Sequence, residues 1–280
     1  MILHHYDQAR HREIVAYTMH DPKVLSLQWV GVFQNWVCGY PDRALESFEE
    51  MIEAARRLAH PFNLSFALTD GAPPLTWMGM CELGVSHAEE ALEIARENRL
   101  AFIEHCICPI FGGLQQSYAG DEETGYALFQ RGLDFWVSVG GRLNTGLLWS
   151  ELGRAAARIG KNDEAMECVD RAIEIADSSG EIWFKPESLR LKGDLLLQQQ
   201  TKEHDLEPAL VCYNAALALA KAQGARSWEL RAAMSLAEVY QGKGEDVLAY
   251  GTLAPVYEWF TEGFNTPDLE SARLLLEGLR

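Results

Sequence analysis

A small residue recurs six times along the 280-residue chain, each time in an Ala-rich, acidic, amphipathic stretch that follows a more apolar one. The successive intervals are 44, 37, 40, 44 and 40 residues. The six positions are Ala44, Ala88, Gly125, Ala165, Ala209 and Ala249. A period near 40 residues, made of two amphipathic stretches, is typical of helix pairs that stack on their neighbours. The sequence therefore predicts an all-α solenoid.

The fourth repeat shows the packing pattern most clearly. Its small and large apolar residues are Trp149, Leu152, Gly153, Ala156, Ala165, Val169 and Ala172. Their spacing is similar to that of the tetratricopeptide repeat, in which small residues let the two helices approach and larger ones fill the space between them. We therefore expect a tetratricopeptide-like α-solenoid, a right-handed superhelix of about six helix pairs with a C-terminal capping helix.

The predicted boundaries follow the same spacing. A single domain over 1–280 would hold repeats near 21–60, 61–100, 101–140, 141–180, 181–225 and 226–264. The capping helix, over 266–279, would begin at Thr266 and Pro267, a hydroxyl cap followed by a proline in the first turn. Leu3–Met19 looks like half of an earlier repeat, so the chain is expected to start inside a longer array, with Met1 as a natural start left open.

Prolines interrupt the first helices of repeats two and three. Pro73 and Pro74 stand in one of them, and Pro109 stands in the other, close to Gly112. A proline inside a helix removes a hydrogen bond and costs about 3 kcal/mol, so both helices are expected to kink or split. Drift in a tolerant array explains such breaks; a pocket lined by the freed backbone groups is the alternative.

The composition disfavours several kinds of partner. The formal net charge is −17 and no basic run is present, whereas nucleic acid and acidic lipid surfaces require clustered Lys and Arg. No apolar stretch approaches the length that a bilayer requires. Six scattered Cys do not resemble a disulfide framework, so we expect reduced thiols and a cytoplasmic location. No cofactor is expected.

Motifs of catalysis are missing from the sequence. It has no phosphate-binding Gly-rich loop ending in Gly-Lys-Ser/Thr, no Gly-x-Ser-x-Gly, no His-Glu-x-x-His and no paired Cys-x-x-Cys. Two groups of metal-capable side chains occur: His105, Cys106 and Cys108, and near the start His4, His5 and His11. Small buried cysteines and a polar terminus explain both groups. We predict no metal site and no catalytic residue.

The first helix of each pair is expected to line an inner groove in this kind of repeat. Aromatic residues of the early repeats fall there, namely Trp29, Phe33, Trp36, Trp77 and Tyr118. Arginines of the later repeats follow, namely Arg154, Arg158, Arg190 and Arg231. An arginine fork suits a carboxylate or phosphate of a partner. Alternatively, these arginines pair with Glu187, Asp194 and Glu238 in a ladder that holds the array together.

The later repeats and the C-terminus carry a family resemblance. The segments are Leu189–Leu197, Ser227–Leu236, Leu253–Phe264 and Thr266–Leu269. They resemble the C-terminal tetratricopeptide region of large bacterial regulators, in which a class III adenylate or guanylate cyclase domain or a DNA-binding domain precedes a signalling ATPase. The resemblance implies a regulatory sensor or scaffold without cyclase or ATPase activity, because those motifs lie in other domains.

Three functions remain open on the sequence. The leading hypothesis is a non-enzymatic regulatory scaffold that binds a protein or peptide, with an ATPase- or cyclase-type domain N-terminal to this chain as one candidate partner and a homodimer as another arrangement. The alternative is a small-molecule sensor with its ligand among Trp29, Trp36 and Trp77. The third is an enzyme at the broken helices of repeats two and three.

Overall fold

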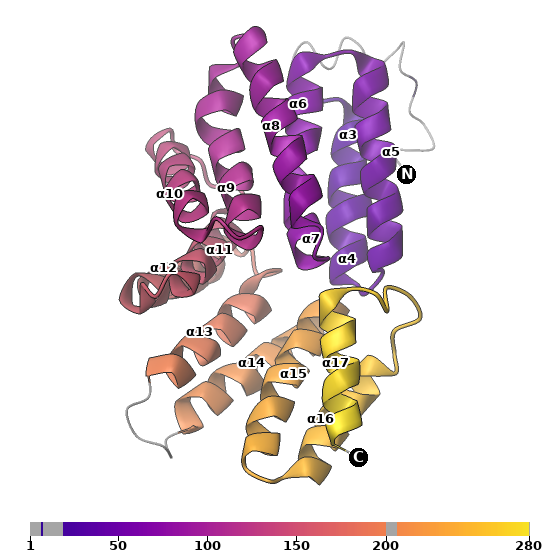
Figure 1. Ribbon diagram of the computed structural model, residues 1–280, viewed down its shortest axis with the longest axis vertical. Coiled ribbons are helices and arrows are strands. Elements are labelled where there is room, and N and C mark those ends of the chain that lie inside the picture. The colour runs from indigo at the N-terminus through magenta and orange to yellow at the C-terminus, as the bar shows by residue number, and fades with distance from the viewer. Residues whose placement is uncertain (1–6, 8–18, 200–205, 280) are drawn as a thin grey trace. The chain divides into compact units, whose positions relative to one another are not determined.

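The computed structural model describes residues 7, 19–199 and 206–279, and every regular element within them is a helix (Figure 1). These residues fall into two compact units. The N-terminal unit lies within Met1–Trp36 and Tyr40–Gly140, and the C-terminal unit lies within Val37–Gly39 and Gly141–Arg280. None of the helices in the described ranges combines the length and the apolar composition needed to cross a bilayer.

The N-terminal unit holds repeats one to three, apart from residues 37–39. Repeat one consists of α3 (Pro22–Ser26), the π-helix η1 (Leu27–Gln34), α4 (Asn35–Val37) and α5 (Pro41–Leu58). Repeat two consists of α6 (Pro61–Asp70), α7 (Ala72–Trp77) and α8 (Cys81–Glu97). Repeat three consists of the π-helix η2 (Ile103–Ile107), α9 (Cys108–Tyr118) and α10 (Glu122–Ser138). In each repeat the interrupted first helix packs against the long second one.

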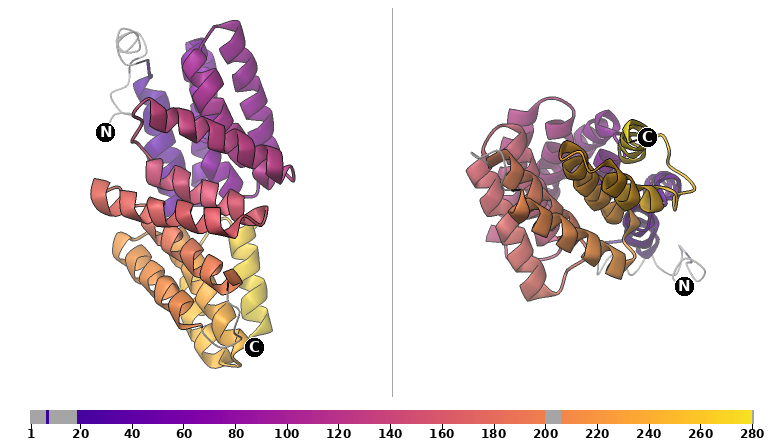
Figure 2. Two further views of the ribbon diagram at one scale, coloured as in Figure 1. Left: turned by 90° about the vertical axis from the view of Figure 1, so that its left-hand side faces the viewer. Right: turned by 90° about the horizontal axis from the view of Figure 1, so that it is seen from below.

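The C-terminal unit is more regular. Its pairs are α11 (Thr145–Arg158) with α12 (Asn162–Ser179), α13 (Lys185–Gln199) with α14 (Glu207–Gln223), and α15 (Arg226–Gly242) with α16 (Asp246–Tyr257). The last helix, α17 (Pro267–Gly278), packs on α15 and α16. Successive helices from α13 to α16 lie side by side and run in opposite directions (Figure 1, Figure 2). The predicted all-α, tetratricopeptide-like helix-pair architecture is confirmed.

Small residues bring the two helices of a pair together, as the spacing predicts. Ala44, Ala165, Ala209 and Ala249 are fully buried. At Gly125 on α10, an added Cβ would lie only 2.3 Å from the backbone nitrogen of Ser117 on α9. Repeat three therefore packs backbone against backbone, which only glycine allows.

The proline breaks take two different forms. In repeat two the helix splits at Gly71, and Pro73 and Pro74 fall in the first turn of α7, where missing N–H groups do no harm. In repeat three the backbone stays right-handed helical through Cys108, but the turn before Pro109 widens into the π-helix η2. The wider turn displaces the carbonyl groups that the proline ring would meet.

The chain ends agree only in part with the sequence analysis. Thr266 precedes Pro267 in an extended conformation, as expected for a cap, but its hydroxyl donates to the carbonyl oxygen of Gly263 at 2.7 Å and accepts no helix N–H. The half-repeat expected at Leu3–Met19 lies, except for Asp7 and Met19, outside the described residues. The same holds for His4, His5 and His11.

Candidate functional site

The aromatic residues predicted for an inner groove form a packed core in the N-terminal unit. Phe33, Trp36 and Trp77 are only 4, 2 and 3% exposed. The rings of Trp36 and Trp77 lie 4.5 Å apart between centroids, and Phe33 meets Trp77 edge-on at 6.2 Å. Trp29 is half-buried and stacks on Phe33 at 5.3 Å, and Tyr118 is the last residue of α9. Such burial leaves Phe33, Trp36 and Trp77 little surface to offer a ligand.

Three of the four predicted arginines converge on one carboxylate in the C-terminal unit. Glu187 of α13 is fully buried. Arg154 of α11 lies 2.5 Å from Glu187 Oε1, and Arg231 of α15 donates to the same oxygen at 3.1 Å. Arg190, one turn further along α13, donates to both carboxylate oxygens at 2.9 and 3.0 Å. We call Glu187, Arg154, Arg190 and Arg231 the Glu187 cluster.

Further acidic groups surround the cluster. Arg190 Nη1 donates to Asp194 at 2.7 Å, and the Tyr213 hydroxyl donates to the other oxygen of Asp194 at 2.8 Å. Arg231 Nε donates to Asp268 of α17 at 2.8 Å. The charged side chains therefore come from the first helices α11, α13 and α15 and from the last helix α17, and Tyr213 joins them from α14. These contacts support the alternative in which the arginines pair with acidic side chains and hold the repeats together. Glu187 and Asp194 are two of the three acidic partners expected there.

Electrostatics keep the cluster charged. Burial would raise the pKa of Glu187, but Arg190, Arg154 and Arg231 outweigh it and hold this pKa well below its ordinary value. For Arg190 the balance is the same: burial opposes the charge, and Asp194 and Glu187 raise its pKa well above the ordinary value. A buried carboxylate that three guanidinium groups contact is stable as an anion over the whole neutral range.

Two expected members lie outside this arrangement. Arg158 lies at the exposed end of α11, one turn beyond Arg154. None of the ion pairs found in the described part of the chain involves Glu238. Burial, together with the nearby charge of Asp194, raises the pKa of Glu238.

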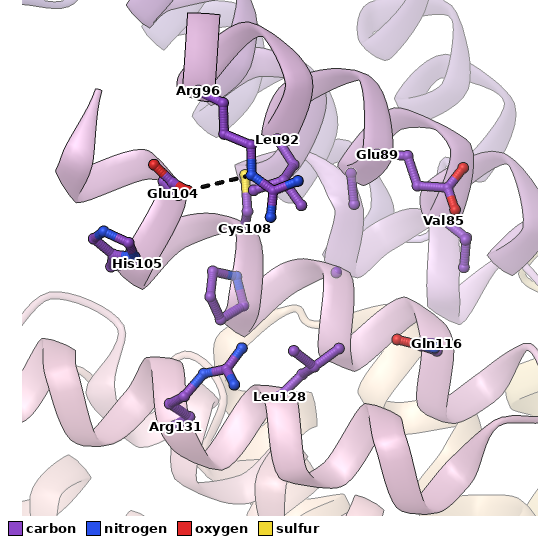
Figure 3. Close-up of a pocket in the computed structure, with 13 residues that line it drawn as sticks. Val85, Glu89, Leu92, Arg96, Glu104, His105, Cys108, Gln116, Leu128 and Arg131 are labelled. Atoms are coloured by element: carbon purple, nitrogen blue, oxygen red, sulfur yellow. Dashed lines mark hydrogen bonds and ion pairs between the residues drawn. The ribbon is translucent and has the colours of Figure 1, made fainter. Parts of the chain in front are cut away.

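A pocket of about 360 Å³ opens in the N-terminal unit between α8, α9 and α10 (Figure 3). It lies at the widened turn before Pro109, where the sequence left a pocket as one of two explanations. Its apolar surface comes from Val85, Ala88, Leu92, Cys108, Pro109, Gly112 and Leu128. Gly112 has no side chain to fill the pocket beside Ala88. An added Cβ at Gly112 would lie 3.2 Å from the Ala88 Cβ. A second hollow of about 470 Å³ shares the wall at Pro109 and Arg131 and extends along α10 to Ser138.

Charged side chains stand around this pocket. Arg96 Nε of α8 lies 3.2 Å from Glu104 Oε1 of η2. Arg131 of α10 projects toward the pocket from the opposite side (Figure 3). Among the ion pairs and hydrogen bonds of the described residues, none involves Arg131. The pocket thus combines an apolar floor with one paired and one unpaired guanidinium, a combination that residue spacing alone did not reveal.

The cysteines beside the pocket behave as core groups. Burial raises the pKa of Cys106 and of Cys108 to about 12. Cys106 Sγ contacts the carbonyl oxygen of Gly132 at 3.8 Å, while His105 is exposed. Within the described ranges, no group of three or more His, Cys, Asp or Glu side chains is placed to hold a metal ion.

Comparison with known proteins gives distant matches. No family model matches the chain. An uncharacterised protein of Rhizobium meliloti (strain 1021) is 22% identical over 235 residues, which is 84% of this chain and 22% of that protein. The chain therefore spans about a fifth of the length of the curated relative it matches.

Two solved structures share the fold. The apo form of RapI has a TM-score of 0.59 at 10% identity, covering 97% of this chain and 90% of RapI. A signal transduction ATPase with numerous domains from Pyrococcus horikoshii, described as having a tetratricopeptide repeat sensor, has a TM-score of 0.51 at 14% identity. That match covers 86% of this chain and 40% of the ATPase. Both matches support the fold, a tetratricopeptide-like helical repeat.

Proposed function

We propose that this chain is a non-enzymatic binding module of a multidomain signalling regulator, and that it binds a protein or peptide on the first helices of the C-terminal unit. The observation that carries the proposal is the Glu187 cluster. It joins α11, α13, α15 and α17 through buried charged contacts, so these helices present one rigid face. A rigid face loses little conformational freedom on binding, which favours affinity for an extended partner.

The surrounding architecture of similar proteins supports a partner within the same regulator. The curated relative is nearly five times longer than its matched segment, and the Pyrococcus protein combines a repeat sensor with an ATPase. A neighbouring ATPase- or cyclase-type domain is accordingly the first partner to consider. A free peptide is the second.

A display library of random peptides, selected on the immobilised 280-residue chain, tests the proposal. We expect a shared motif among the selected peptides and one-to-one binding of a synthetic copy by calorimetry, with a Kd in the micromolar range, about −8 kcal/mol. A scrambled copy of the same peptide is the control. Selection without a shared motif, or equal binding of the scrambled copy, contradicts the proposal.

The pocket favours a second candidate, a small-molecule sensor. Its volume of about 360 Å³ falls at the small end of the range of about 300–1,000 Å³ for ligand sites, and it combines an apolar floor with a few polar groups. The ligand would bind between α8 and α10, away from the buried rings of Trp36 and Trp77. Catalysis there has less support, because the raised pKa of Cys108 keeps its thiol protonated and weakly nucleophilic.

A further inference from the structure

We infer that the pocket between α8, α9 and α10 binds a small organic carboxylate with an apolar body, its anionic end on Arg131. This inference rests on the sensor function as the second candidate and names its ligand class. It is carried by the apolar floor and by the charges that face it.

The floor requires an apolar body. Leu92 of α8 and Leu128 of α10 line the pocket (Figure 3), and Pro109 of α9 adds to its apolar surface. Gly112 and Ala88 add surface without filling the space. Water over this apolar floor finds few hydrogen-bond partners, so a hydrocarbon group that displaces it there gains the usual hydrophobic free energy.

The charges select the anionic end. Arg131 has no carboxylate partner among the described residues, whereas Glu104 is engaged by Arg96. Glu89, the other acidic group of the lining, lies at the far end of the pocket beside Val85 (Figure 3). A ligand carboxylate at Arg131 would form a charge-assisted pair. Arg96, which lines the same pocket, adds a second positive charge.

The size limits the ligand to a small one. A volume of about 360 Å³ equals roughly a dozen water molecules of liquid. A single ring or a short alkyl chain with one carboxylate fits this space. A peptide helix, about 10 Å across, does not.

Three matched probes test the inference on the full 280-residue chain: 4-phenylbutanoate, its neutral primary amide and 4-phenylbutylamine. Binding is detected by saturation-transfer NMR, quantified by calorimetry, and located from the chemical shift of the Arg131 Nε–H group. We expect the carboxylate to bind at least about tenfold more tightly than the amide, because a charge-assisted hydrogen bond exceeds a neutral one. The amine should bind weakest.

Two variants locate the anion contact. Arg131→Gln should weaken the carboxylate about tenfold and leave the amide unchanged. Arg99→Gln removes the same charge at an exposed position outside the pocket lining and should change neither. Both replaced side chains are exposed, so thermal unfolding should be unaffected and a folding defect can be recognised.

The outcomes separate the ligand class from the sensor function. Equal binding of acid and amide in the pocket overturns the inference and leaves a sensor for neutral ligands. An unchanged affinity in Arg131→Gln also overturns it. If none of the three probes binds, the inference fails and the sensor function loses its support, while peptide binding elsewhere is unaffected.

Discussion

Glu187 and Arg190 lie one turn apart on α13, and two hydrogen bonds of 2.9 and 3.0 Å join their side chains. Arg154 and Arg231 reach the same carboxylate from the preceding and following first helices. Residues that are 33 and 44 positions distant from Glu187 in the sequence thus depend on one buried anion. The buried Glu187 carboxylate therefore links α11, α13 and α15 of the C-terminal unit.

Replacing Glu187 by Gln should lower the free energy of unfolding by about 3–5 kcal/mol, because three largely buried guanidinium groups lose their shared anion. The lowered pKa of Glu187 sets the pH dependence: the stabilisation is present above the ordinary Glu value of 4.5 and is lost as the pH falls below it. Urea unfolding at pH 7 and pH 4, followed by circular dichroism, measures both effects.

Glu277→Gln is the matched control for that change. Glu277 pairs with Arg273 at 2.7 Å, but the glutamate side chain is 55% exposed. Exposed pairs contribute little, so this variant should stay within about 0.5 kcal/mol of the parent chain. Similar losses in the two glutamate variants would contradict the role given to Glu187.

Arg154 and Arg190 distinguish a ladder from a ligand groove. If these arginines lined a ligand groove, replacing both by Ala would weaken partner binding and leave the fold intact. The contacts of these arginines with Glu187 predict instead a clear fall in melting temperature, because the carboxylate stays buried with only Arg231. Thermal unfolding followed at 222 nm decides between them: an unchanged melting temperature would reject the ladder.

Asp70 should make the N-terminal unit less stable as the pH rises. Burial raises the pKa of Asp70 from 3.8 to about 7, against the hydrogen bond that Gln28 donates to it. Between these values the unfolded chain has released the proton while the folded chain keeps it, so stability falls with increasing pH, by an order of 4 kcal/mol in total. Protonated Asp70 can also offer a donor to Gln28 Oε1, a buried oxygen without a partner.

Asp70→Asn should remove most of this slope, because the amide does not titrate. Urea unfolding at pH 5 and pH 8 gives the slope for each variant. Asp134→Asn, at an exposed position of α10, should leave it as in the parent chain. A parent chain that is equally stable at pH 5 and pH 8 would refute the assignment of Asp70.

Two glycines should respond to alanine with opposite signs. Gly125→Ala places a Cβ 2.3 Å from the Ser117 nitrogen and should destabilise the chain by about 1–3 kcal/mol through overpacking. Gly251 lies in α16, and a Cβ there meets nothing within 4 Å. Gly251→Ala should therefore stabilise by about 0.5–1 kcal/mol. Chemical denaturation of the two variants checks the signs.

The sequence predicted the helix pairs well because one small residue per repeat must sit where two helices touch. Ala165 and Gly125 mark that contact directly, and periodicity is enough to find them. Periodicity was insufficient for Trp36 and Trp77. A residue on the first helix faces either a groove or the packing of the next repeat, and local spacing is the same in both cases.

The pocket and the Glu187 cluster depend on long-range geometry. Arg96 and Arg131 are 35 residues apart, and only the packing of α8, α9 and α10 brings them to one cavity. Pro109 indicated from the sequence that the first helix of repeat three is irregular. It did not show whether neighbouring side chains would fill the space beside the widened turn or leave a pocket. In the same way, the sequence placed Arg154, Arg190 and Glu187 on first helices without showing which of two roles the arginines have.

Hydrogen–deuterium exchange of the 280-residue chain, with and without the selected peptide, tests the central claim most directly. A binding face on the first helices of the C-terminal unit predicts slower exchange in 145–158, 185–199 and 226–242, with no change in 81–131. Protection confined to 81–131 would place the peptide at the pocket and contradict the claim, as would protection confined to the second helices α12, α14 and α16.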